Sequence, residues 1–188
     1  MKKISAGYLA GLLLALTAFY LTVPVVVRSE VDFDANYWYD KGYEETNLDL
    51  KIKYYNKSLE LKADNPDIYN NLGVIYKKKG LYKKAVEYFQ KALLIVHYKT
   101  PEYAYINLAL VYRLQKKYPE AISTYKKAIQ LNPAFPQSYN GLGMTYKDMG
   151  DFDNALKQFK LALEVNPGFV AADLNIKNLW KVSAGDSS

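Results

Sequence analysis

The chain contains no cysteine, a single histidine and only two arginines, Arg28 and Arg113. Without a thiol it cannot form a disulfide, a cysteine-ligated metal site or a lipid-modified amino-terminal cysteine. The sequence offers His97 no identifiable orienting partner, and it contains neither a glycine-rich phosphate loop nor a metal-ligand spacing. We therefore expect no catalytic residues, no bound metal and no cofactor.

The scarcity of arginine also argues against nucleic-acid binding. The formal net charge is only +6, and arginine is the residue best suited to bidentate contacts with phosphates and base edges. The basic residues are mostly lysines, clustered at 77–79, 83–84 and 116–117 near predicted turns. Solvated turn residues explain these clusters most simply, and contact with anionic lipid or an acidic protein is the alternative.

What the chain does contain is an internal repeat. The stretches 69–73, 105–109 and 139–143 align, and Leu72, Leu108 and Leu142 within them are separated by 36 and 34 residues. A period of this length carried by two helical patterns predicts a solenoid of helix pairs. The residues that recur at fixed offsets are Tyr76, Tyr112 and Tyr146; Tyr82, Tyr118 and Phe152; Ala85, Ala121 and Ala155; Phe89, Tyr125 and Phe159; and Ala92, Ala128 and Ala162.

This pattern resembles the tetratricopeptide repeat family, with Pro133 and Pro167 in its final slot. The resemblance implies an all-α, right-handed superhelical solenoid of antiparallel helix pairs, with repeats at 66–101, 102–135 and 136–169. Near His97 the proline is missing and two extra residues precede Pro101. We expect either a longer second helix or a looser joint there.

The ends of the array are expected to differ from its middle. Residues 30–65 resemble a degenerate capping repeat, and residues 170–182 read as a lone capping helix. The tail at 183–188 has nothing to bury and is expected to be disordered. Within the array, Gly80 and Gly150 are expected in left-handed conformation after a helix, and Asp151 is expected to cap the helix that follows.

Residues 1–29 form a separate segment, a membrane anchor or a secretion signal. Residues 4–27 carry no charge and are long enough to cross a bilayer as one transmembrane helix. Lys2 and Lys3 precede this stretch, so the amino terminus is expected in the cytoplasm and the repeats on the extracytoplasmic side, such as the periplasm. The alternative is a soluble, secreted protein produced by cleavage after Ala18.

The resemblance further implies that the first helix of each pair lines an inner groove that holds a protein segment. Lys77, Arg113 and Lys147 occupy equivalent slots and predict a line of cations, which suits a partner with acidic and apolar groups. We expect a non-enzymatic adaptor at the membrane that acts in complex assembly or secretion. An alternative function is a self-assembling, homo-oligomeric scaffold. An alternative explanation of the groove residues is that they are simply helix faces exposed to water. The predicted groove residues are Asn70, Asn71, Val74, Lys77, Ile106, Asn107, Leu110, Arg113, Asn140, Met144 and Lys147.

Overall fold

The structure is a computed structural model that describes residues 33–183, with side chains described as far as Leu179. This range is all-helical and contains no strand. The predicted transmembrane segment at 4–27, the cleavage site after Ala18 and the tail at 184–188 lie outside it. The helices are α2 (Ala35–Glu44), α3 (Leu48–Leu61), α4 (Pro66–Lys78), α5 (Tyr82–Leu93), α6 (Pro101–Leu114), α7 (Tyr118–Leu131), α8 (Pro136–Asp148), α9 (Phe152–Val165) and α10 (Val170–Ser183).

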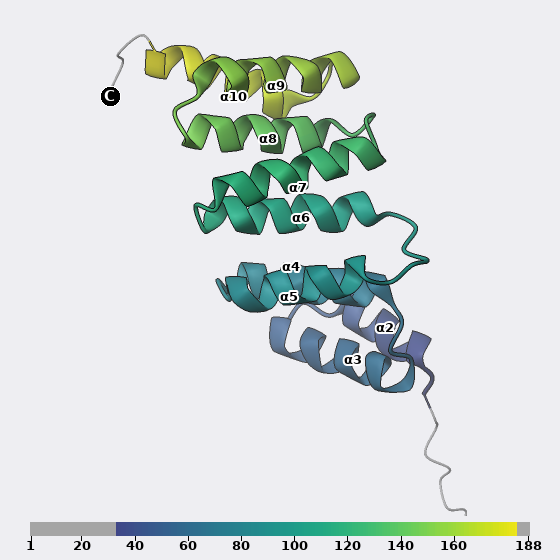
Figure 1. Cartoon of the computed structure of the whole chain (residues 1–188). Helices are drawn as coiled ribbons and strands as arrows, with labels where there is room; N and C mark the ends of the chain where they lie inside the picture. Colours follow the sequence, from purple (N-terminus) through teal and green to yellow (C-terminus); the bar gives the residue numbers. More distant parts are fainter. Residues whose placement is uncertain (1–32, 184–188) are drawn as a thin grey trace, which may run out of the picture. The chain divides into compact units, whose positions relative to one another are not determined.

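The helices form consecutive hairpins that stack in chain order (Figure 1). Each first helix packs mainly on its own second helix, as α4 does on α5 and α6 on α7, and α10 packs on α9. Successive first helices also touch, α4 on α6, α6 on α8 and α8 on α10, whereas no comparable contact joins successive second helices within residues 33–183. The first helices therefore lie on the inner side of the stack. We call the side of α4, α6 and α8 that carries the predicted groove residues the inner face.

Close packing within a hairpin depends on a small residue opposite an aromatic ring. A Cβ added to Gly73 would lie 2.5 Å from the Phe89 ring, and one added to Gly143 would lie 2.6 Å from Phe159. Phe89 and Phe159 are fully buried. Because the ring occupies the space that a side chain would need, the two helices approach at the short end of helix packing distances.

Three of the four turns that join a first helix to its second helix, α4–α5, α6–α7 and α8–α9, have a left-handed residue in the same slot. Gly80 and Gly150 have φ angles of +72° and +81°, as the sequence predicted. In the α6–α7 turn this slot is filled by Lys116, whose φ angle is +59°. This conformation costs a residue with a Cβ roughly 1–2 kcal/mol. Asp151 caps α9 as predicted, accepting a hydrogen bond from the Asn154 backbone N–H.

The irregular joint between α5 and α6 is a loop. Helix α5 ends at Leu93, so the alternative of a longer second helix is wrong, and residues 94–100 connect it to α6. His97 is exposed in this loop. The two extra residues are thus accommodated outside the helices, and the register of α6 is kept.

None of the helices in the part of the chain that the structure describes combines the length and apolar character needed to span a bilayer.

Candidate functional site

The predicted groove residues lie together on the inner face, on three successive first helices. Each of them is half-buried, which places it between the core and the open surface. They divide into polar residues that bond from helix to helix and apolar residues that pack into the joints. From α4 come Asn70, Asn71, Val74 and Lys77; from α6, Ile106, Asn107, Leu110 and Arg113; and from α8, Asn140, Met144 and Lys147.

Asn107 connects α6 to α4 through both ends of its amide. Its Nδ2 donates to Asn70 Oδ1 at 3.4 Å, and its Oδ1 accepts from Lys77 Nζ at 3.0 Å. An amide side chain is suited to this position because it can donate and accept at once. These three polar residues are therefore held in place by one another before any partner arrives.

The same contact recurs at the far end of the inner face. Asn175 of α10 donates from Nδ2 to Asn140 Oδ1 at 2.8 Å. Asn175 follows Asn107 by two repeat periods of 34 residues. Continuing the repeat register into the terminal helix would have identified Asn175 from sequence, because α10 occupies the place of a further first helix.

At the middle joint, between α6 and α8, an aromatic ring replaces the asparagine pair. The equivalent slots hold Ile106 and Gly141, and the Tyr125 hydroxyl oxygen lies 2.7 Å from where a Gly141 Cβ would stand. Tyr125 is only 2% exposed, and burial raises the pKa of its hydroxyl to about 12, with nearby Asp148 also raising it and Arg113 lowering it. The hydroxyl thus stays protonated at neutral pH.

Arg113 does not contribute a free cation to the predicted line of charges. Its Nη1 forms an ion pair with Asp148 Oδ2 at 3.0 Å, and its side chain is only 16% exposed. Its Nε is buried with no hydrogen-bond partner in the described residues. Asp148 is not one of the predicted groove residues, so the sequence did not indicate that Arg113 would be neutralised.

Lys77 and Lys147, the other two predicted cations, form no ion pair with the described residues. Burial, followed by repulsion from Lys78, lowers the pKa of Lys77 from its ordinary value. Only one of the three Lys77 N–H groups is used, in the bond to Asn107. The Lys147 ammonium forms no ion pair or hydrogen bond with any other residue in 33–179.

A cavity of about 360 Å³ opens where the first hairpin meets α4. Helix α2 has 10 residues whereas α4 has 13, so the last turn that would cover this joint is missing. Asn71 and Val74 line the cavity, and Asn71 Nδ2 donates to the Tyr55 hydroxyl at 3.2 Å. Burial is the main cause that raises the pKa of Tyr55 to about 12. Two predicted groove residues thus border a hollow rather than a neighbouring helix.

Three of the apolar groove residues lie on the inner face and also contact the hydrophobic core. Val74 packs against the cluster around Phe89, Met144 against the cluster around Phe159, and Ile106 against the cluster that contains Tyr125. Their half-burial therefore reflects contacts inside the stack as well as exposure on the inner face.

Residues 33–183 hold no group of His, Cys, Asp or Glu side chains arranged to bind a metal ion.

Comparison with known proteins agrees with this architecture. The sequence profile of the tetratricopeptide repeat matches residues 64–134, and a second profile of the same repeat matches residues 136–169. The comparison with curated proteins returned no match.

Several solved structures share the fold. A crystal structure of MamA is 27% identical and aligns over 77% of this chain and 84% of its own, with a TM-score of 0.66. Residues 41 to the end of MamA from Desulfovibrio magneticus RS-1 are 17% identical, covering 81% of this chain and 86% of that one, with a TM-score of 0.68. A chain of the APC/C hetero-tetramer Cut9–Hcn1 is 23% identical over 78% of this chain but only 30% of its own, with a TM-score of 0.70.

The stacked hairpins, the small residue opposite each buried ring and the two profile matches lead to one assignment. Through residues 64–134 and 136–169, this chain belongs to the tetratricopeptide repeat family.

Proposed function

We propose that the protein is a non-enzymatic scaffold that holds an extended or helical segment of a partner protein against its inner face. The observation that carries this proposal is the direction of the polar groups there. The side-chain oxygens of Asn70, Asn107 and Asn140 all accept hydrogen bonds from neighbouring side chains of the stack. Lys77 Nζ and Asn107 Nδ2 each use one N–H within the stack, so their other N–H groups remain as donors, together with the Asn70 and Asn140 amide N–H groups and the Lys147 ammonium group.

A surface that offers donors and positive charge fits a partner that supplies acceptors. Backbone carbonyls of a polypeptide and the carboxylates of its acidic residues are such acceptors. Leu110 and the exposed parts of Val74 and Met144 add apolar area between the donors. Because the asparagines are already ordered by their mutual bonds, binding would cost less side-chain entropy than on a loose surface.

The decisive experiment is site-specific photocrosslinking of the full chain in native membranes and cell extract. A photoreactive amino acid at Leu110 should capture a partner, and the double variant Lys77→Glu, Lys147→Glu should lose it. Arg113 is left intact because reversing it would set two carboxylates side by side at Asp148 and disturb the stack. The matched control is Lys157→Glu, Lys160→Glu, which reverses two exposed charges on the outer helix α9. Equal capture by both double variants would refute the inner face as the binding surface.

We also propose that residues 4–27 anchor the protein in a membrane, with the amino terminus in the cytoplasm and the repeats on the other side. The support is the uncharged length of that stretch and the two lysines before it. In this setting the scaffold would act in complex assembly or secretion, because anchoring raises the local concentration of the groove near membrane partners. Intact-mass measurement of the native protein distinguishes this from a secreted form cleaved after Ala18.

A further inference from the structure

Lysines concentrate at the α4–α5 and α6–α7 turns, each of which joins a first helix to its second helix. Residues 78–84 contain four lysines and no acidic residue, and residues 114–120 contain two lysines and one acidic residue, Glu120. The equivalent residues 148–154 contain no lysine and three aspartates. The charge is thus a property of the α4–α5 and α6–α7 turns, and a repeat needs no such charge in order to fold.

An open, apolar hollow of about 460 Å³ lies between these two turns. It is lined by Gly80, Leu81 and Tyr82, by the stems of Lys83 and Lys84, and by Gln115 from the neighbouring turn. Leu81 is 45% exposed although it is a large apolar side chain. In the other two repeats the slot of Leu81 holds Lys117 and Asp151, so its apolar character is specific to this place.

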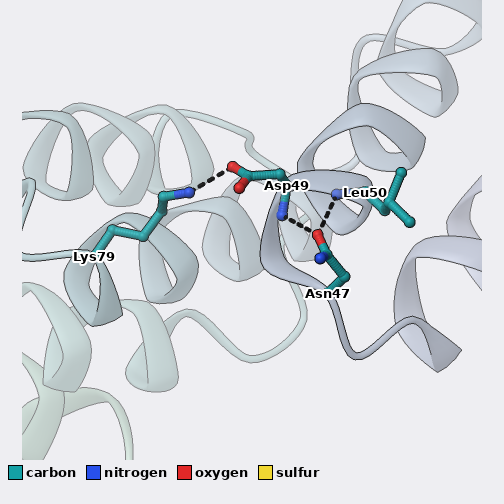
Figure 2. Close-up of polar contacts among 4 residues, drawn as sticks. All are labelled: Asn47, Asp49, Leu50 and Lys79. Atoms are coloured by element: carbon teal, nitrogen blue, oxygen red, sulfur yellow. Dashed lines mark hydrogen bonds and ion pairs between the residues drawn. The ribbon is translucent and has the colours of Figure 1, made fainter.

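The lysines around the hollow are only partly neutralised by the protein itself. Lys79 forms an ion pair with Asp49, whose helix α3 is capped by Asn47 (Figure 2). Lys84 Nζ lies 5.3 Å from the centre of the Tyr76 ring. The ammonium groups of Lys83, Lys116 and Lys117 form no ion pair or hydrogen bond with residues 33–179.

We propose that these two turns, with the hollow between them, form a second docking site that takes an acidic protein segment carrying one bulky apolar side chain. A polypeptide supplies both complements: carboxylates for the lysines and an apolar side chain for the hollow. An anionic bilayer matches the lysines but offers no side chain shaped to the recess. This site lies at the turns, apart from the inner face, so its test is independent of the groove.

The test uses the full chain in detergent micelles and fluorescence anisotropy of labelled probe peptides. One probe carries a central leucine with four glutamates on each side, and the other has serine in place of the leucine. We expect the leucine probe to bind about tenfold more tightly, because burial of that side chain is the main apolar contact.

Charge variants separate this site from general attraction. Lys83→Glu, Lys117→Glu should weaken the leucine probe about tenfold or more, whereas Lys126→Glu, Lys127→Glu, an equal charge change on exposed residues of α7, should leave it nearly unchanged. Equal weakening by the two pairs, or equal affinity of the two probes, would overturn the proposal. If phosphatidylglycerol vesicles lose binding to the Lys83, Lys117 variant while the probe does not, the turns are a lipid site and the proposal is wrong.

Discussion

Replacing Gly141 by alanine sets two physical effects against each other. Helix propensity favours alanine over glycine in the interior of α8 by about 1 kcal/mol. The added Cβ, however, would overlap the far end of the Tyr125 ring, whose hydroxyl oxygen lies 2.7 Å from the Cβ position. Tyr125 is 2% exposed and has little room to move, so overpacking should cost about 2–3 kcal/mol. The net expectation is a loss of about 1–2 kcal/mol in the free energy of unfolding.

Urea denaturation followed by far-UV circular dichroism measures this change. The matched background is Tyr125→Leu, because leucine lacks Cε1, Cζ and the hydroxyl, the three atoms that the new Cβ would meet. In that background Gly141→Ala should raise stability by about 1 kcal/mol, so the two substitutions should be coupled by about 2–3 kcal/mol. A stabilising effect of Gly141→Ala in the parent protein would refute the account of the α6–α8 joint.

Three further substitutions test other features of the stack. Lys116→Gly should raise the free energy of unfolding by about 0.5–1 kcal/mol, since it relieves the left-handed strain at φ +59°, and an unchanged urea midpoint would contradict this. Asn107→Ala should cost about 1–2 kcal/mol through loss of its bonds to Lys77 and Asn70, with exposed Gln90→Ala as the control. Because burial raises the Tyr125 pKa from 10.0 to about 12, its contribution is complete below pH 10 and is lost as the pH rises toward 12. Tyr125→Phe should therefore flatten the alkaline decline in stability by about 2–3 kcal/mol, and an unaltered decline would show that Tyr125 is not its source.

The fold followed from the sequence because the repeat fixes local geometry several times over. Gly73 opposite Phe89 and Gly143 opposite Phe159 are the same contact made twice, so the spacing of these residues carries the helix pairing with it. The turns at Gly80 and Gly150 were equally predictable, because a glycine after a helix indicates a left-handed backbone conformation.

The site was less predictable, because its electrostatics depend on contacts between repeats. Lys77, Arg113 and Lys147 occupy equivalent positions of the repeat, which predicted a line of cations. The alignment of repeats does not show whether a side chain from the next helix neutralises one of them. Asp148 does so at Arg113, and its slot in the other repeats holds Lys78 and Leu114, so no recurring pattern marked it. Periodicity identifies what repeats share, and the chemistry of the inner face lies in where they differ.

Because of the cavity beside the short helix α2, the amino-terminal end of the helical array is less tightly packed than its carboxyl-terminal end. Neighbouring hairpins are coupled only through their shared interfaces, so resistance to opening is set joint by joint. At the carboxyl-terminal end α10 is tied to α8 by Asn175, whereas α2 makes no contact with α4 comparable to those between the later first helices. Fraying should therefore begin at residues 35–61 and proceed in one direction along the chain.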